Sequence, residues 1–294
     1  MKKLADKIKR VGLIGNLAKA GCAENVRRAS RLIQRAGRRI ICEEETARLD
    51  GLKSVAAPDA ASLAREVDLL LVFGGDGTML HVARDIAGSS TPVLGVNLGG
   101  LGFLTAVPSD ELPRALKHVW RGEFKFEARD LIEAGAVCQG RPIRATALND
   151  IVISRGAVSR LITLDVSVDG ELVTRYRCDG LIISSPTGST AYSLAAGGAV
   201  VLPTAEVFVM TPICPHALSN RSIILPLSSI IRVKAVTPQP ATLLSADGQV
   251  VAELDAGDEI TIRRSRSAIR LMHLADSSFL EALRRKLHWR GTYL

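Results

Sequence analysis

The sequence predicts a mixed α/β and all-β fold in two parts: an N-terminal parallel α/β domain and a C-terminal antiparallel, β-sandwich-like domain. Two observations predict this. Apolar strand runs alternate with amphipathic helix patterns over residues 11–96, which is typical of a parallel sheet covered by helices. Beyond about residue 105, short alternating runs and Asp-Gly turns predominate, which is typical of antiparallel pairing.

The first part is Rossmann-like in its alternation of elements. Expected strands cover residues 11–15, 69–73 and 92–96, and expected helices cover Glu24–Ala36 and Thr78–Ala87. The run at 69–73 is continuously apolar, which indicates a strand buried on both faces of a parallel sheet.

The second part contains the antiparallel signals. Expected strands cover residues 162–168, 207–210, 230–233 and 260–262. Asp169-Gly170 and Asp247-Gly248 have the composition of tight hairpin turns.

A last helix is expected over Ser277–Trp289, with Leu280, Leu283 and Leu287 on one stripe, and we expect it to pack back on the N-terminal domain. The expected domains are therefore residues 1–104, joined by 276–294, and residues 105–275.

Composition excludes several classes of protein. Of 294 residues, 47% are hydrophobic and 23% are charged, so the chain can form a globular core. No apolar run approaches the roughly 18 residues of a membrane span, and the first apolar stretch is too short for a signal peptide. We expect a cytoplasmic protein that binds no membrane. The net charge of +8 suits an anionic partner, but aromatics are only 4%, so no nucleic-acid stacking platform is indicated.

Cysteine and histidine patterns indicate neither a disulfide framework nor a protein metal site. The five cysteines are widely spread and contain no CxxC pair. The five histidines show no metal-ligand spacing.

The sharpest local motif is Gly74-Gly75-Asp76-Gly77-Thr78, between an expected buried strand and an expected helix. Glycines let backbone N–H groups approach phosphate oxygens, and the helix N-terminus favours an anion. An aspartate in such a loop suits a proton acceptor for an attacking hydroxyl, or a metal ligand. A tight turn ending in a threonine helix cap is the alternative reading.

Two further segments carry polar groups beside apolar strands. Residues 178–193 form an apolar run that ends in a loop rich in hydroxyl groups, with the aromatic side chain of Tyr192. Asn149-Asp150 interrupts an apolar run, where an amide and a carboxylate could bracket ribose hydroxyls. An ordinary helix-capping loop and a bulge or turn are the respective alternatives.

Other nucleotide and hydrolase motifs are missing. The first strand is not followed by G-x-G-x-x-G, and Gly100-Leu101-Gly102 lacks the third glycine of that pattern, which disfavours a standard dinucleotide-dependent dehydrogenase. G-x-x-x-x-G-K-[ST] is absent, and Ser184 lacks a G-x-S-x-G context.

Taken in order, these motifs resemble those of the NAD kinase family. The matching segments are Gly74–Thr78, Leu98–Leu104, Asn149-Asp150 and Asp179–Tyr192 with Gly197-Gly198. The segment Gly74–Thr78 is shared with diacylglycerol and sphingosine kinases. The long stretch from Asp179 to Gly198 narrows the resemblance to the NAD kinase family.

The resemblance implies an enzyme that transfers the γ-phosphoryl group of ATP, or in some members polyphosphate, to the 2′-hydroxyl of the adenosine ribose of NAD, giving NADP. It also implies a divalent metal ion (Mg²⁺ or Mn²⁺) and a homodimer or homotetramer, with NAD and ATP as substrates and no nucleic-acid partner.

The resemblance also implies roles for individual residues. Asp76 would accept the proton of the 2′-hydroxyl, and the phosphate loop would be Gly74, Gly75, Gly77 and Thr78. The implied NAD-binding residues are Asp76, Gly77, Asn149, Asp150, Arg160, Arg177, Asp179, Thr190, Ala191, Tyr192, Ser193, Leu194, Ala195 and Gln249. The usual Asn-Glu pair of the family is Asn-Asp here, one methylene shorter, and Ala195 and Cys214 also depart from its pattern.

Two competing functions follow from the same residues. A lipid kinase would need an apolar cleft and a membrane-facing patch, against which the hydroxyl-rich loop at Ser184–Ser193 argues. A non-catalytic dinucleotide-binding regulator would not need a proton acceptor, so the presence of Asp76 argues against this function.

Overall fold

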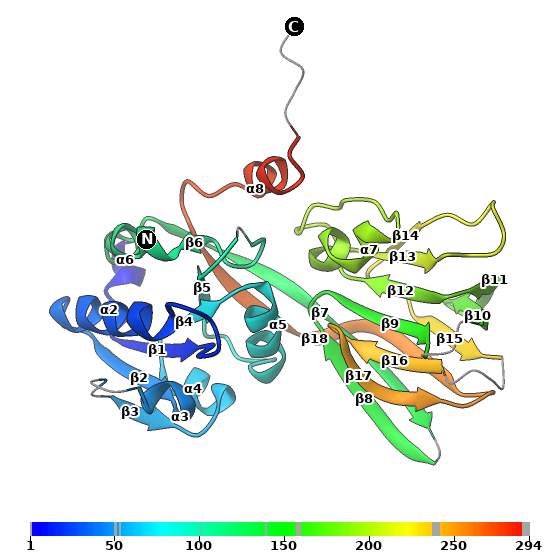
Figure 1. Ribbon diagram of the computed structural model, residues 1–294, viewed down its shortest axis with the longest axis horizontal. Helices are drawn as coiled ribbons and strands as arrows, with labels where there is room; N and C mark the ends of the chain where they lie inside the picture. The colour runs from blue at the N-terminus through cyan, green and yellow to red at the C-terminus, as the bar shows by residue number, and fades with distance from the viewer. Residues whose placement is uncertain are drawn as a thin grey trace, which may run out of the picture. The chain divides into compact units, whose positions relative to one another are not determined.

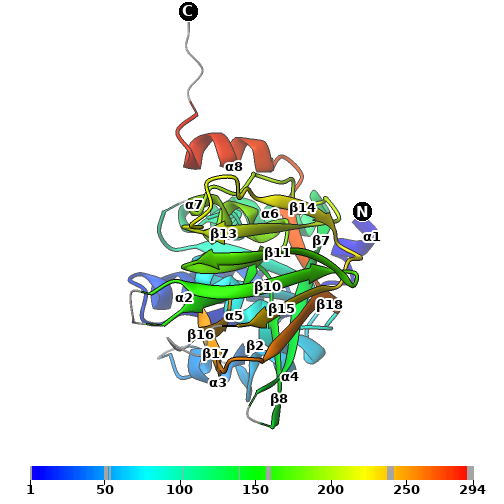
Figure 2. The same cartoon turned by 90° about the vertical axis from the view of Figure 1, so that its right-hand side faces the viewer.

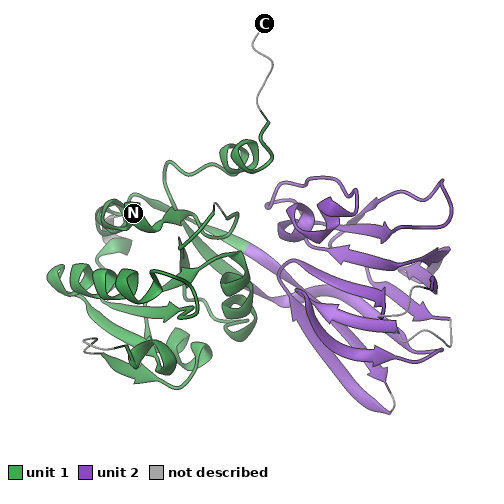
Figure 3. Ribbon diagram, in the orientation of Figure 1, with its two compact units in different colours: residues 1–128, 269–294 green, residues 129–268 purple. Residues whose placement is uncertain are grey.

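The computed structural model describes residues 2–49, 52, 54–100, 102–138, 140–156, 160–236 and 242–289. The chain divides into two compact units, residues 1–128 with 269–294 and residues 129–268 (Figure 3). The first boundary falls later than the expected 104/105, and the second falls earlier than the expected 275/276. Strands β7 (Phe124–Cys138) and β18 (Glu259–Leu274) each have residues in both units.

Unit 1 is built on a parallel sheet with the strand order β5-β4-β1-β2-β3, which confirms the predicted α/β architecture (Figure 1). Its strands are β1 (Arg10–Gly15), β2 (Arg39–Glu43), β3 (Val55–Ala57), β4 (Leu69–Gly74), β5 (Val93–Asn97) and β6 (Val107–Pro108). β6 and the end of β18 pair in parallel with β5.

The helices of unit 1 include four, α1, α3, α4 and α6, that the sequence did not predict. They are α1 (Lys2–Ala5), α2 (Cys22–Arg35), α3 (Glu44–Ala47), α4 (Ala60–Glu66), α5 (Asp76–Asp85), the 3₁₀ turn η1 (Ser109–Glu111), α6 (Leu112–Arg121) and α8 (Phe279–Lys286). The region after residue 105 was expected to be mostly strand, yet α6 buries Leu112, Leu116 and Val119 in the core of unit 1. This packing places the boundary beyond α6.

Two expected helices differ in their ends. α5 begins at Asp76, two residues earlier than the expected Thr78, because Gly75 is extended and serves as the N-cap. α8 is shorter than Ser277–Trp289, and of its expected apolar stripe Leu283 is buried whereas Leu280 is 56% exposed. α8 belongs to unit 1, as expected for a helix that packs on the α/β part.

Unit 2 is a sandwich of two mainly antiparallel sheets, which confirms the predicted architecture of the C-terminal part. One sheet has the order β11-β10-β15-β18 (Figure 2), and the other has the order β14-β13-β12-β9-β16-β17. The remaining bounds are β8 (Arg141–Ala147), β9 (Asp150–Arg155), β10 (Ile162–Val168), β11 (Glu171–Cys178), β12 (Gly180–Ser184), the 3₁₀ turn η2 (Thr187–Thr190), α7 (Tyr192–Ala195), β13 (Val207–Ile213), β14 (Ile223–Pro226), β15 (Ile231–Ala235), β16 (Thr242–Ala246) and β17 (Gln249–Leu254).

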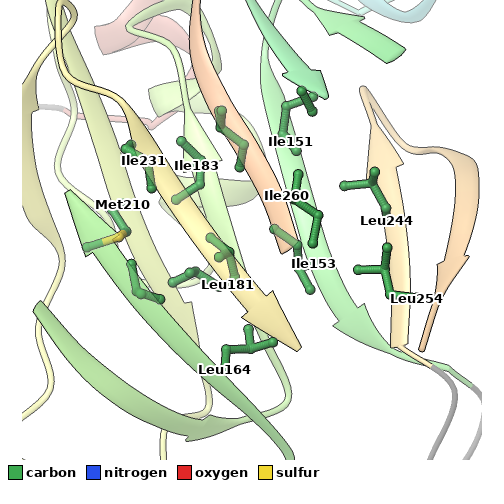
Figure 4. Packing of buried hydrophobic residues seen from close by; sticks show 14 of the residues in the cluster. Ile151, Ile153, Leu164, Leu181, Ile183, Met210, Ile231, Leu244, Leu254 and Ile260 are labelled. Carbon is green, nitrogen blue, oxygen red and sulfur yellow. The ribbon is translucent and has the colours of Figure 1, made fainter. Parts of the chain in front are cut away.

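Inward-facing aliphatic side chains from both sheets form the core of unit 2 (Figure 4). Ile151 and Ile153 of β9 and Leu181 and Ile183 of β12 point to the same side because alternate residues of a strand share a face. Both predicted hairpin turns are present, since Asp169 and Asp247 have positive φ angles of 52° and 47° ahead of Gly170 and Gly248. Among the described residues, no helix has the length and apolarity to cross a bilayer.

Candidate functional site

The glycine loop lies at the carboxyl edge of the parallel sheet of unit 1. β4 is buried along its whole length and ends at Gly74, and α5 begins at Asp76. The backbone bonds Asn16 N–H to Phe73 O and Leu98 N–H to Gly74 O bring the segments after β1 and β5 to the same edge. Ligands of open parallel sheets bind at this edge, as the sequence reading expected for the loop.

The Asp76 carboxylate is held by the segment that follows β5. Its Oδ2 accepts the backbone N–H of Phe103 at 2.8 Å, and its Oδ1 accepts the N–H groups of Leu104 at 3.0 Å and Thr105 at 3.3 Å. The Thr105 hydroxyl also lies 3.3 Å from Oδ1. The side chain remains 30% exposed. Asp76 is therefore oriented by three peptide groups and still reaches solvent.

Gly102 makes this arrangement possible. A Cβ atom at position 102 would collide with Asp76 Oδ1 and with the Thr105 hydroxyl. The neighbouring Asn97 side chain fixes the first half of the segment, donating to Gly100 O at 2.7 Å and accepting from Gly99 N–H at 2.8 Å. Leu101 of the predicted motif lies outside the described residues.

One cation, Lys19, and one amide, Asn16, lie beside the glycine loop. The Nζ of Lys19 lies 2.8 Å from where a Cβ of Gly75 would stand. Asn16 Nδ2 donates to the Thr78 hydroxyl at 3.2 Å, and Gly74 leaves that hydroxyl the space it needs. The N-terminus of α5 and the ammonium of Lys19 together have the chemistry of a phosphate site. The sequence reading identified the glycines but missed Asn16 and Lys19.

A small cavity adjoins this segment within unit 1. It has a volume of about 300 Å³ and is lined by Asn97, Leu98, Gly99, Thr105, Pro108, Ser109 and Asp110. Thr105 therefore contacts both the cavity and the Asp76 carboxylate.

A second carboxylate organises the predicted site residues of unit 2. A bend at residues 148–149 separates β8 from β9, and Asp150 is the first residue of β9. Asp247 accepts the backbone N–H groups of Leu148 at 2.9 Å, Asn149 at 2.8 Å and Asp150 at 3.2 Å. The sequence reading assigned Asp247 only to a hairpin turn and missed this role.

The Asp150 side chain is only 4% exposed. Burial first, and then the nearby charge of Asp247, raise the pKa of its carboxyl group to about 7. Asp150 is thus a buried carboxyl group that titrates near neutral pH.

The hydroxyl-rich segment after β12 packs against this junction. Ser184 is the register partner of Asp150, and Ser185 N–H donates to Asn149 O at 2.8 Å. The Ser185 hydroxyl accepts the N–H of Gly188 at 3.2 Å. A Cβ at position 188 would collide with Asn149 O. The structure therefore brings Asn149, Asp150 and the segment 184–190 together.

A buried hydroxyl group anchors the loop at 190–195, while other residues of the loop are exposed. The buried Ser193 hydroxyl lies 3.0 Å from the Thr211 hydroxyl, which lies 2.8 Å from that of Ser222. Gly198 makes room for Ser193. Tyr192 is 47% exposed, and Ala195 is also exposed, whereas Thr190, Ala191 and Leu194 are partly buried.

The remaining predicted residues lie at the surface of unit 2. Asp179 accepts a hydrogen bond from Arg155 Nε at 2.8 Å, a partner that the sequence reading did not name. Arg160 and Arg177 are exposed, and Gln249 is the exposed first residue of β17, directly after the Asp247-Gly248 turn. Asp76 and Gly77 belong to unit 1, and the other predicted NAD-binding residues belong to unit 2.

Unit 1 also contains a cation near Asp76 that the sequence analysis did not assign to the site. Lys286 Nζ of α8 lies 3.5 Å from Asp76 Oδ2. A cluster of three or more histidine, cysteine or acidic side chains suited to a metal ion is absent from the described part of the chain.

Comparisons with known proteins agree with this architecture. A model of the ATP-NAD kinase N-terminal domain matches residues 11–124, and a model of the ATP-NAD kinase C-terminal domain matches residues 148–274. An NAD kinase of Cupriavidus pinatubonensis is 40% identical over 282 residues, covering 96% of this chain and 92% of the relative. An NAD kinase of Syntrophotalea carbinolica is 44% identical over 232 residues, covering 79% and 81%.

Solved structures show the same fold. The crystal structure of yeast NADH kinase complexed with NADH has a TM-score of 0.87 and 30% identity, covering 98% of this chain and 89% of that one. A structure of an NAD kinase from Archaeoglobus fulgidus in complex with ATP has a TM-score of 0.76 and 24% identity, covering 96% and 100%, and shows the fold alone.

Proposed function

This chain belongs to the ATP-NAD kinase family, and from that premise we propose that it transfers the γ-phosphoryl group of ATP to the 2′-hydroxyl of the adenosine ribose of NAD. In this reaction the ribose oxygen forms a bond to the γ-phosphorus, and the bond from that phosphorus to the β–γ bridging oxygen breaks. The hydroxyl proton leaves, and the products are NADP and ADP.

The observation that carries the proposal is the position of Asp76 beside a phosphate-type loop. The carboxylate begins α5 and is oriented by the N–H groups of Phe103, Leu104 and Thr105. Phosphoryl transfer through a loose transition state asks little of a base until late in the reaction. We therefore assign Asp76 the orientation of the ribose hydroxyl and the final acceptance of its proton.

The phosphates of the donor would bind at the first turn of α5. Gly74, Gly75, Gly77 and Thr78 form the loop, and Lys19 places its ammonium group beside Gly75. These groups support binding of an anionic donor. ATP is the proposed donor, and polyphosphate is a second donor that this chemistry admits.

We assign NAD to the predicted residues of unit 2. Asn149 and Asp150 lie beside Ser184, Ser185 and Gly188, which precede the loop 190–195 in the chain. Tyr192 in that loop offers an exposed aromatic face. Arg160, Arg177, Asp179 and Gln249 complete the proposed set. The yeast relative was solved with NADH, so the reduced dinucleotide is also a candidate substrate.

Enzymes of this family generally depend on a divalent metal ion. The described residues do not fit a resident ion, because they contain no cluster of three or more histidine, cysteine or acidic side chains that could hold one. We therefore propose that Mg²⁺ or Mn²⁺ enters with the phosphates of the donor, as part of the substrate, and we assign no step to it. A homodimer or homotetramer is proposed from the family alone.

The test is an assay of NADP formation by the purified full-length chain. NAD and NADH are each supplied with ATP or with polyphosphate, in the presence of Mg²⁺, and diacylglycerol replaces the dinucleotide in a parallel reaction. We expect NADP from NAD and ATP, and no phosphorylated lipid. Binding of NAD without consumption of ATP would instead support a non-catalytic regulator.

A further inference from the structure

Lys286 connects the last helix of unit 1 to the Asp76 carboxylate. It is the final residue of α8, and its Nζ lies 3.5 Å from Asp76 Oδ2. The same Nζ lies 4.3 Å from the centre of the Phe103 ring. Phe103 in turn donates its backbone N–H to the same Oδ2. Lys286, Phe103 and Asp76 therefore form a closed set of three contacts.

The position of the lysine is set by its helix rather than by the ion pair alone. Phe279, the first residue of α8, packs on Phe103 with ring centroids 5.7 Å apart. Leu283 is buried, and the Ser278 side chain caps the helix at Glu281 N–H. Lys125 Nζ also donates to Ser277 O at 2.9 Å, directly before the helix. Both ends of α8 are thus tied to unit 1 near the site.

The contact differs from an ordinary surface ion pair. The Lys286 and Asp76 side chains are only 28% and 30% exposed. On the same helix turn Arg285 instead pairs with Glu281, four residues earlier, with its side chain 67% exposed. Exposed ion pairs such as Arg285–Glu281 contribute little to the stability of the fold. Lys286, by contrast, meets a carboxylate whose orientation matters to the chemistry proposed above.

We propose that Lys286 is a positioning residue for Asp76. Its ammonium group and the Phe103 N–H share Oδ2, while the Leu104 and Thr105 groups hold Oδ1. Together they fix both oxygens of the carboxylate, so that it faces the ribose hydroxyl in one orientation. This inference rests on the proposed function, in which Asp76 is the proton acceptor.

Three variants of the full-length chain test the role of the charge. Lys286→Met removes the charge but keeps an unbranched side chain that packs on the Phe103 ring. Lys286→Arg retains the charge. Arg285→Met is the matched control, because it removes a neighbouring charge that points to Glu281.

We expect Lys286→Met to lower kcat about ten-fold or more, since small displacements of a reacting group cost rate steeply, and to leave KM for NAD within two-fold. Lys286→Arg should recover most of kcat. Arg285→Met should match the unmodified chain. Equal kcat values for Lys286→Met and Arg285→Met would overturn the proposal, as would an equal loss in the Lys286→Arg variant.

A second measurement needs no turnover. Hydrogen exchange of the amides of Phe103, Leu104 and Thr105 should be faster in Lys286→Met than in Arg285→Met, because the carboxylate that accepts these amides is less constrained. If the unmodified chain makes no NADP, the proposed function fails, and exchange still reports whether Lys286 holds the carboxylate. Unchanged exchange and unchanged kcat in an active enzyme would reject the positioning role alone.

Discussion

Asp247 Oδ1 accepts the backbone N–H of Asn149 at 2.8 Å, although 98 residues separate the two in the sequence. The carboxylate also accepts N–H groups on either side of Asn149. Because Asp247 occupies a left-handed turn position, it reaches these groups without extending β16. The turn between β16 and β17 thereby holds the backbone at the start of β9.

Replacing Asp247 tests this relationship. Asp247→Asn tolerates the left-handed backbone but puts an amide donor where one oxygen accepted N–H groups. We expect it to lower the free energy of unfolding by about 1–3 kcal/mol and to weaken NAD binding. Urea unfolding and calorimetric titration with NAD measure the two effects.

Asp169→Asn is the matched control for that variant. Asp169 has the same left-handed conformation in the other Asp-Gly turn, and its Oδ1 accepts the N–H of Ile230 at 2.7 Å. An asparagine oxygen can keep this bond, so stability and NAD affinity should change little. Equal effects of the two substitutions would contradict a special role for Asp247.

Asp150 gives the protein a pH dependence of stability. Burial first, and then the charge of Asp247, raise the pKa of its carboxyl group from 3.8 to about 7. The folded state therefore binds more protons than the unfolded state between these values, so stability falls as pH rises and levels off above pH 7. The slope from this one group is at most about 1.4 kcal/mol per pH unit.

The Asp150→Asn variant isolates this contribution. Urea unfolding at pH 5.5 and pH 7.5 should show the unmodified chain losing about 2 kcal/mol more than the variant between the two values. Parallel pH profiles would show that Asp150 does not titrate in this range. Asp255→Asn, at an exposed turn after β17, is a control for removing a carboxylate.

Local sequence patterns predicted many of the strands and helices, but they could not predict contacts between residues that are distant in the sequence. The alternation of Ile162–Val168 gave β10 with its observed bounds, because every second side chain is buried. The helix α6 was missed although Leu112, Leu116 and Val119 have helical spacing, since the surrounding region was interpreted as strand. The capping glycine Gly122, with a φ of 77°, was a usable signal.

The site was predicted at the level of motifs. Asp76 and Asn149-Asp150 were identified because acidic and amide groups stand out beside apolar strands. Their partners Lys286 and Asp247 were not, because they lie 210 and about 98 residues away and carry no pattern of their own. A lysine in the last turn of a helix is ordinarily explained by its favourable interaction with the helix dipole. Only the structure shows that Lys286 also contacts the Asp76 carboxylate.

Gly102 tests whether the orientation of Asp76 matters. Gly102→Ala puts a Cβ against Asp76 Oδ1 and the Thr105 hydroxyl, so one of them must move. We expect kcat for NADP formation to fall at least about ten-fold, with little change in melting temperature. Gly135→Ala, in β7, has open space around the added Cβ and should match the unmodified chain. Full activity of Gly102→Ala would show that the carboxylate needs no fixed position.

Lys19 separates donor binding from dinucleotide binding. Lys19→Met removes the ammonium group beside Gly75, and loss of a charge-assisted contact to a phosphate should raise KM for ATP about ten-fold while KM for NAD stays unchanged. Lys117→Met, an exposed position on α6, is the matched control. An increase in KM for NAD instead would assign Lys19 to the dinucleotide.

Asp76→Asn tests the proton acceptor itself. The amide cannot accept the hydroxyl proton, so turnover should fall by at least the roughly 100-fold typical of a general base, while calorimetric titration should show NAD binding retained. The amide nitrogen would also face the Phe103 N–H, which shifts the loop, so the loss combines both effects.

Asp85→Asn controls for removing a carboxylate from the same helix. Asp85 is the last residue of α5 and lies 3.5 Å from His81 Nε2, at the opposite end from the glycine loop. It should keep the turnover of the unmodified chain. Near-normal turnover in Asp76→Asn would refute the assignment of Asp76. If Gly102→Ala disturbs the loop and loses less activity than Asp76→Asn, the difference measures what the carboxylate contributes as a base beyond its place in the loop.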